Sequence, residues 1–143
     1  MIKIFEITEA DDASLDAVNR LLPQLSKSAK IINGSTLQKL TNSECTRLYV
    51  AKEGDTIFGM LSLVVFSIPT GTKAWIEDVV VDERARGKGV GKELMNHALN
   101  VAKGLGAKSA DLTSRPSREA ANKLYQAIGF EGRETNVYRY KTS

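Results

Sequence analysis

The first third of the chain changes from a strand pattern to helix patterns. Apolar and polar side chains alternate over residues 1–8, which predicts an opening strand. Beyond a polar stretch the apolar positions recur every three or four residues, so we expect an amphipathic helix whose N-cap is Asp11 or Asp12. Pro23 predicts that this helix is interrupted or ends there. A shorter helix should follow, with Ser35 at the start of a capping box.

Three β-rich apolar runs separated by turns fill the middle of the chain. They cover residues 46–52, 57–68 and 75–81, and glycine-containing turns lie between them. The third run is apolar on both faces at its end, which is typical of a central strand. Consecutive strands joined by short turns predict a β-meander.

The last third alternates helices with short strands. A long helix follows a glycine-rich turn, and the residues expected on its apolar face are Val90, Leu94, Ala98, Val101 and Leu105. A short strand over residues 109–113 precedes a helix that begins near Pro116, with Ser117 as its cap. Residues 137–140 are expected to close the chain as a final strand.

The composition is that of a globular protein in a reducing compartment. Of the 143 residues, 42% are hydrophobic and 26% are charged, which allows a core and argues against disorder. Cys45 is the single cysteine, so no internal disulfide can form, and with one histidine a zinc site is not expected. No apolar run is long enough to cross a bilayer, and the first residues do not resemble a signal peptide. We therefore expect one cytoplasmic domain, residues 1–143, without a metal or a membrane partner.

The net charge of +3 is mildly basic. It suits an anionic small molecule or weak contact with nucleic acid, and ordinary surface charge explains it equally well. A nucleic-acid binder needs a clustered basic face with interleaved aromatic side chains. The few aromatic residues lie mostly on strand-like runs, so nucleic acid is not an expected partner.

The stretch Arg86-Gly87-Lys88-Gly89-Val90-Gly91 lies between a predicted strand and a predicted helix. Glycine leaves backbone N–H groups uncovered, and a helix N-terminus adds unpaired donors and partial positive charge. Formal charge comes from Arg84, Arg86, Lys88 and Lys92. These features predict an anion cradle suited to a pyrophosphate. The alternative is a flexible turn flanked by solvated cations.

Two common phosphate-binding loops do not fit this stretch. A P-loop needs G-x-x-x-x-G-K-S/T, but Gly87 to Gly91 is one residue short, and Glu93 stands where the hydroxyl residue belongs. A dinucleotide fingerprint needs G-x-G-x-x-G directly after a strand, whereas these glycines follow the pattern G-x-G-x-G after a charged turn. The meander upstream also does not build a doubly wound sheet.

The stretch is similar to the signature R/Q-x-x-G-x-G/A of the GNAT superfamily of acyl-CoA-dependent N-acetyltransferases. The preceding I-E-D-V-V-V-D, residues 76–82, resembles the fourth strand of that family, and L-Y-Q-A-I-G-F, residues 124–130, resembles its L-Y-x-x-x-G-F segment. The order of elements agrees along nearly the whole chain. The resemblance implies an α/β fold with a mixed, mostly antiparallel sheet of about six or seven strands, helices on both faces and a splayed central strand pair.

The resemblance also implies where acetyl-CoA binds. The turn that would hold the CoA pyrophosphate through its amides consists of Arg86, Gly87, Lys88, Gly89, Val90, Gly91 and Lys92. The main chain of Val79, Val80 and Val81 would pair with the pantetheine arm, because the fourth and fifth strands diverge there and leave main-chain groups open. The family often has Asn seven residues before its tyrosine. Arg118 stands there instead, so Arg118 or Asn122 is expected to contact CoA.

Acetyl transfer to an amine needs a base for the amine and a proton donor for the CoA thiolate. Tyr125 resembles the family's tyrosine general acid, and a phenol with a pKa of about 10 stays protonated. The alternative is a core tyrosine. Glu77 is favoured as the base, with Asp78 or water as alternatives, and strand alternation predicts opposite faces for the two carboxylates. His97 is expected on the polar face of its helix and is not favoured.

The resemblance thus implies an enzyme that moves an acetyl group from acetyl-CoA to a primary amine by direct attack in a ternary complex. No obvious covalent nucleophile suggests a ping-pong route. The alternative is a non-catalytic acyl-CoA-binding sensor or structural module with the same fold. The family commonly dimerises, so a homodimer is expected. The acceptor amine, whether small molecule or protein, has no signature in the sequence.

Overall fold

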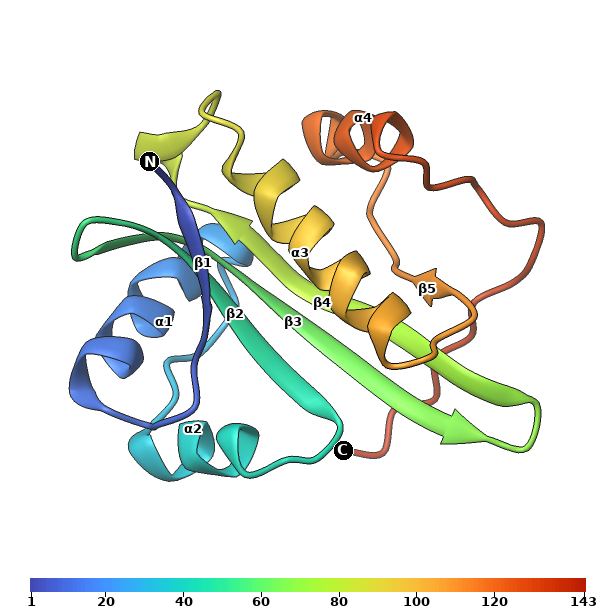
Figure 1. Cartoon of the computed structure of the whole chain (residues 1–143), viewed down its shortest axis with the longest axis horizontal. Helices are drawn as coiled ribbons and strands as arrows, with labels where there is room; N and C mark the ends of the chain where they lie inside the picture. Colours follow the sequence, from blue (N-terminus) through green and yellow to red (C-terminus); the bar gives the residue numbers. More distant parts are fainter. The chain divides into compact units, whose positions relative to one another are not determined.

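A five-stranded sheet forms the centre of the first 113 residues. The computed structural model describes residues 1–143, which divide into two compact units, residues 1–113 and residues 114–143. The strands are β1 (Lys3–Glu6), β2 (Thr46–Glu53), β3 (Thr56–Ile68), β4 (Gly71–Val81) and β5 (Ala110–Asp111). They lie side by side in sequence order (Figure 1), and all neighbours are antiparallel except the parallel pair β4–β5. The sheet is therefore mixed and mostly antiparallel, as expected.

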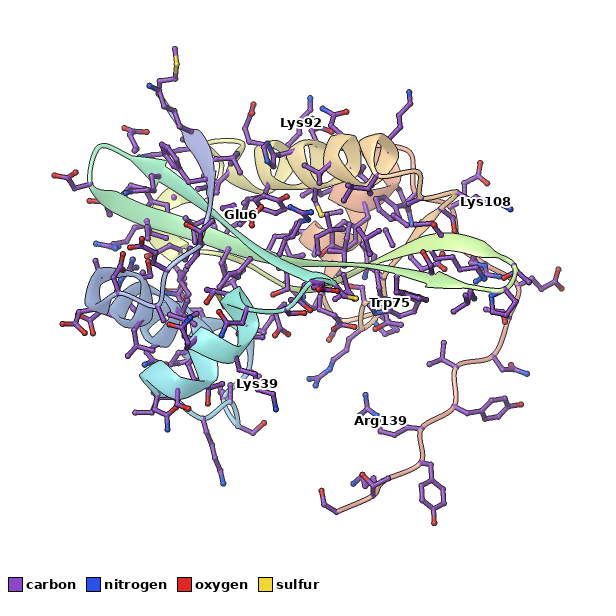
Figure 2. All side chains as sticks on the ribbon, turned by 60° about the horizontal axis from the view of Figure 1, so that its bottom comes forward. Glu6, Lys39, Trp75, Lys92, Lys108 and Arg139 are labelled. Carbon is purple, nitrogen blue, oxygen red and sulfur yellow. The ribbon has the colours of Figure 1, made fainter.

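Helices cover both faces of this sheet. They are α1 (Asp12–Leu25), α2 (Gly34–Thr41) and α3 (Val90–Gly104), and the short 3₁₀ helix η1 (Glu83–Ala85) connects β4 to α3. Helix α3 runs along one face, while α1 and α2 lie along the other (Figure 2). The second unit contains one helix, α4 (Glu119–Ala127).

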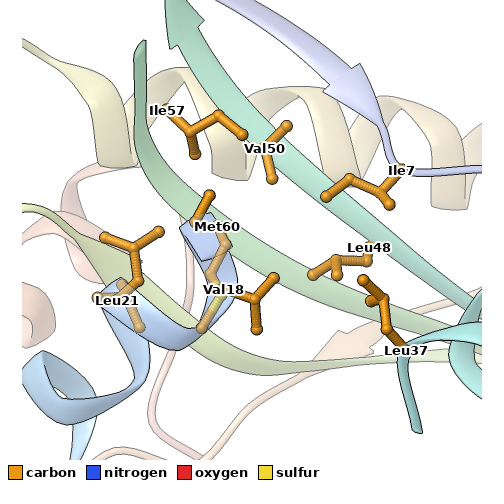
Figure 3. Close-up of a cluster of buried hydrophobic side chains, with 10 residues drawn as sticks. Ile7, Val18, Leu21, Leu37, Leu48, Val50, Ile57 and Met60 are labelled. Atoms are coloured by element: carbon orange, nitrogen blue, oxygen red, sulfur yellow. The ribbon is translucent and has the colours of Figure 1, made fainter. Parts of the chain in front are cut away.

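A buried apolar cluster fixes α1 and α2 on their face of the sheet (Figure 3). Its members are Ile7, Ala17, Val18, Leu21, Leu37, Leu48, Val50, Ile57, Met60 and Val80. Burying one large aliphatic side chain contributes about 1.5–3 kcal/mol. The cluster includes Val80 near the end of β4, so the strand that leads to the glycine turn is anchored in this core.

Helix α3 approaches β3 closely because position 59 has no side chain. A Cβ atom on Gly59 would lie 2.9 Å from Cγ1 of Val90 and 3.0 Å from Cδ1 of Leu94. The apolar side chains that α3 buries are those of Val90, Leu94, Met95, Ala98 and Ala102. Val101 is half-buried and Leu105 is 45% exposed. The buried face therefore follows the row of residues four apart and does not turn toward Val101 and Leu105 as predicted.

Several helix boundaries differ from the sequence prediction. Helix α1 has Asp11 as its N-cap and continues through Pro23. The proline is tolerated because it lies in the last turn, where it removes only one helical hydrogen bond. Helix α2 is capped by the side chain of Asn33, not by Ser35. Helix α4 begins after Arg118 without a side-chain cap, so Ser117 is not its cap.

The predicted final strand is absent. Residues 137–140 have no strand partner, and the side chains of Val137, Tyr138 and Tyr140 are 73%, 87% and 90% exposed. An alternating pattern becomes a strand only where a neighbouring edge satisfies the main-chain groups. The sheet therefore has five strands, not six or seven.

Candidate active site

Strand β4 has an open edge in its second half. It pairs with β5 at Ala74 and Trp75 only, because β5 ends at Asp111. From Ile76 to Val81 no strand lies beside β4 on that side. The end of β5 therefore leaves main-chain groups of β4 available to a ligand on that side.

The peptide directions at the end of β4 show which of the three valines face the open edge. The N–H of Asp82 donates to the carbonyl of Phe58 on β3 at 2.8 Å. The carbonyl of Val81 belongs to the same planar peptide and therefore points away from β3. The carbonyl of Val79, two residues earlier, also points away from β3. Val80, by contrast, pairs with Met60 of β3 and buries its side chain in the core. Val79 and Val81 thus offer carbonyls to the open edge.

A β-bulge interrupts β4 next to Glu77. Ser62 of β3 pairs with Glu77 and Met60 pairs with Val80, so two residues of β4 oppose one residue of β3. Asp78 lies in the bulge with φ of +51°, a left-handed conformation that aspartate tolerates better than most residues. Regular alternation does not hold at a bulge, so the argument that placed Glu77 and Asp78 on opposite faces does not apply here. Both side chains are exposed.

Glu77 lies beside an indole that the sequence reasoning missed. Trp75 precedes it by two positions on the same side of the strand, and the Trp75 Nε1–H donates to Oε2 of Glu77. Figure 2 shows Trp75 on the face of the sheet opposite α3. The hydrogen bond orients the carboxylate and leaves Oε1 for another partner. A carboxylate next to an aromatic ring is suited to attract an ammonium group and to accept its proton.

The glycine turn leads into a helix without a side-chain cap. Gly87 and Gly89 have φ of +84° and +80°, which only glycine adopts without strain. Gly89 is the N-cap of α3 and provides no capping side chain, so the first N–H groups of this helix are available to an anion. The side chains of Arg86, Lys88 and Lys92 are exposed around the turn, and Figure 2 shows Lys92 directed away from the sheet. The turn thus combines open N–H donors with exposed cations, and its binding of an anion stays a prediction.

One cation of the turn is engaged by a buried carboxylate. Arg84 contacts Asp82, whose side chain is 3% exposed. Hydrogen bonds from Arg84, against the opposing effect of burial, lower the pKa of Asp82 to about 2. Asp82 was not singled out from the sequence. A carboxylate directly after an apolar strand, next to two arginines, was the available signal.

The remaining predicted residues lie in the second unit. Tyr125 is buried, and its ring lies 6.0 Å from the ring of Phe130. Burial raises the pKa of Tyr125 above its ordinary value, while the charge of Arg118 opposes the shift. The phenol therefore stays protonated at neutral pH and can donate. Arg118 is exposed, and Asn122 donates from Nδ2 to the carbonyl of Arg115 at 2.9 Å.

His97 does not lie on the solvent face of α3 as predicted. It is half-buried, and its ring makes an edge contact with the buried ring of Tyr49 at 4.7 Å between centroids.

An open pocket of about 460 Å³ lies near the start of α1 and is lined in part by Asp16, Arg20 and Arg84. It includes neither Glu77 nor the glycine turn.

No group of three or more His, Cys, Asp or Glu side chains is arranged to hold a metal ion. None of the helices combines the length and the apolar character that spanning a bilayer requires.

Solved structures share this fold along almost the whole chain. A transcriptional regulator from Bacillus halodurans C-125 is 24% identical with a TM-score of 0.85, covering 99% of this chain and 100% of that one. An aminoglycoside acetyltransferase from an uncultured soil metagenomic sample, in complex with trehalose, is 23% identical with a TM-score of 0.85, covering 99% and 96%. AAC(6')-Iy, in complex with the bisubstrate analogue CoA-S-monomethyl-acetylneamine, is 16% identical with a TM-score of 0.82, covering 100% and 99%.

Comparison by sequence identifies the family. No curated protein matches the chain. A sequence model of the acetyltransferase (GNAT) family matches residues 16–130, which include β4, the glycine turn and Tyr125. Because this match covers most of the chain, the protein belongs to the GNAT family of acetyltransferases and is an acyltransferase enzyme.

Proposed function

We propose that this enzyme transfers an acetyl group from acetyl-CoA to a primary amine by direct attack in a ternary complex. The observation that carries the proposal is the open edge of β4, which runs directly into a glycine turn and an uncapped helix. A long ligand whose amides are followed by a pyrophosphate matches these two features in order. Acetyl-CoA has this composition.

The cofactor contacts follow from the two features. The carbonyls of Val79 and Val81 accept hydrogen bonds from the pantetheine amides at the open edge. The turn binds the pyrophosphate through backbone N–H groups, and exposed cations surround it; its residues are Arg86, Gly87, Lys88, Gly89, Val90, Gly91 and Lys92. Arg118 and Asn122 of the second unit are proposed as further contacts to CoA.

The chemical step needs a base for the acceptor amine and a proton donor for the CoA thiolate. Glu77, directly or through water, takes a proton from the acceptor ammonium, and the resulting amine attacks the thioester carbonyl carbon. The C–S bond then breaks as the amide forms. Tyr125, which burial keeps protonated, gives its proton to the departing CoA thiolate. The second proton that the nitrogen loses as the amide forms passes through water to the Tyr125 phenolate and restores the phenol. Asp78 remains the alternative base, since its side chain is exposed next to Glu77.

The experiment measures binding and turnover separately. Calorimetry with acetyl-CoA comes first, followed by thiol release across a panel of amines. The panel includes aminoglycosides, because the similar protein from a soil metagenomic sample is an aminoglycoside acetyltransferase. Micromolar binding and amine-dependent thiol release are expected. Binding without release for every amine would instead favour a non-catalytic acyl-CoA sensor. Absence of binding at millimolar acetyl-CoA would refute the proposal.

The proposal extends to assembly and compartment. We expect one functional domain, residues 1–143, that forms a homodimer in the cytoplasm. Val137, Tyr138 and Tyr140 are exposed apolar or aromatic side chains that a second copy can cover. Light scattering after size-exclusion chromatography should give twice the monomer mass, and cell fractionation tests the compartment. Residues 1–113 expressed alone should lack transferase activity.

A further inference from the structure

Asp82 connects the glycine turn to helix α1. It is the one charged residue that the structure buries, and it caps η1 directly after β4. Its Oδ1 accepts hydrogen bonds from the backbone N–H of Arg84 at 3.0 Å and from Nε of Arg84 at 3.4 Å. Its Oδ2 accepts from Nη2 of Arg84 at 3.0 Å and from Nη1 of Arg20, on α1, at 2.5 Å. Both oxygens are thus occupied by arginines from two separate elements.

Further contacts strengthen the link between α1 and the turn. Nη2 of Arg20 donates to the carbonyl of Ile57 on β3 at 2.5 Å. One helical turn later, Oε1 of Gln24 accepts the backbone N–H of Glu83 at 2.9 Å. Arg20 therefore bridges a strand end and the carboxylate with the two prongs of its guanidinium, a geometry that lysine cannot reproduce.

The turn beyond this anchor has little internal support. Gly87 and Gly89 have left-handed backbones, and open space surrounds the position of a Cβ atom on either. Glycine has more conformational freedom than any other residue, so a turn that contains two of them gains order mainly from what holds its ends. Val90 and the rest of α3 hold one end in the core. Asp82 holds the other.

We propose that Asp82 and Arg20 are positioning residues for acyl-CoA, which hold the start of the glycine turn against α1 and so preset its N–H groups for the pyrophosphate. This inference rests on the proposed function. A preformed turn loses less conformational entropy on binding, and the gain appears as cofactor affinity. Neither side chain reaches the reacting atoms in this proposal, so kcat at saturation depends on them weakly.

Charge and positioning predict opposite results for Asp82→Asn. Removing a carboxylate frees Arg84 and makes the turn more positive, so a purely electrostatic role predicts tighter binding of acetyl-CoA. A positioning role predicts weaker binding, because the anchor is lost. A role in global stability alone lowers the melting temperature and leaves the affinity of the folded protein unchanged.

The first measurement is calorimetry with acetyl-CoA, together with KM and kcat. Asp82→Asn and Arg20→Met should each raise the Kd and KM for acetyl-CoA roughly tenfold, with kcat within about threefold of wild type. Arg20→Lys should give an intermediate Kd, because it keeps the charge and loses one prong. The Kd of the double variant Asp82→Asn/Arg20→Met should exceed that of the weaker-binding single variant by no more than about twofold. Both residues act through one contact, so their effects should not add. Glu44→Gln makes the same charge change as Asp82→Asn at an exposed site and should have no effect.

The second measurement is hydrogen exchange of the backbone amides in residues 84–91 without cofactor. Both single variants should exchange faster there than wild type, while amides in the centre of α3 keep their protection. If either variant fails to fold, Arg20→Lys supplies the same comparison in a milder form. Unchanged or tighter acetyl-CoA binding in Asp82→Asn and Arg20→Met would overturn this inference alone. Absence of acetyl-CoA binding by the wild type would overturn the proposed function.

Discussion

Glu77 is an exposed carboxylate whose direction is set by its neighbour on the strand. The indole N–H of Trp75 occupies one carboxylate oxygen and leaves the other free to meet an amine. We predict that Glu77→Gln lowers kcat/KM for the amine roughly 10²-fold at neutral pH, because the amide keeps the shape but cannot take a proton. Steady-state kinetics with varied amine measures this effect.

The control for Glu77→Gln is the affinity for acetyl-CoA, which should stay within about twofold of wild type, since the substitution leaves the strand edge and turn intact. Kinetics unchanged in Glu77→Gln and lost in Asp78→Asn would assign the base to the neighbouring carboxylate.

Tyr125 is a buried phenol that burial keeps protonated. We predict that Tyr125→Phe lowers kcat by about 10²-fold or more, because the CoA thiolate then leaves without a proton donor. The Kd for acetyl-CoA should remain close to wild type. Single-turnover thiol release separates this loss from slow product dissociation, and an unchanged rate of release would remove Tyr125 from the chemistry.

Among the elements, the packing of α3 on β3 depends on one missing side chain. Gly59 leaves the space that Val90 and Leu94 fill in the first turns of α3, directly after the glycine turn. We predict that Gly59→Ala destabilises the protein by about 1–3 kcal/mol through overpacking. Gly34→Ala is the matched control, since nothing lies within 4 Å of a Cβ there and the residue starts a helix. Chemical denaturation of both variants measures the difference.

The local elements could be read from the sequence because their signals are local. Spacing of apolar residues predicted the strands of the meander and the helix after the turn, and the glycines predicted a turn with uncovered backbone N–H groups. The final strand over residues 137–140 failed because a strand also needs a partner edge, which periodicity does not report. The bulge at Asp78 was missed for a similar reason, since it exists only in the register with β3.

Contacts between distant residues could not be predicted. Arg20 and Asp82 are 62 positions apart, and nothing in either neighbourhood specifies the other. The placement of His97 against Tyr49 likewise depends on how α3 is rotated over the sheet. For the candidate site, the sequence and the family resemblance therefore supplied the turn, the strand and the candidate acid and base. The structure added Trp75, which contacts Glu77, and Asp82, which contacts Arg84 just before the glycine turn.

At the scale of the whole molecule, Asp82 makes stability depend on acid. Contacts with Arg84 and Arg20 lower its pKa from 3.8 to about 2, so the folded state favours the charged form. This stabilisation is complete above about pH 4 and is lost as the pH falls toward about 2. We predict that the melting temperature of the wild type falls more steeply over this interval than that of Asp82→Asn. Calorimetric scans at a series of pH values test the slope, and parallel curves would contradict it.

The bulge in β4 also has a use in redesign. Pairing with β3 is regular on either side of the bulge, where Ser62 pairs with Glu77 and Met60 pairs with Val80. The surplus residue is therefore stored as a local bend, and excising Asp78 would join the two halves into a plain ladder with Leu61 opposite Val79. Every other side chain of the strand would keep its face. One residue thus accounts for the local bend at the open edge of β4, without changing the faces on which the strand packs.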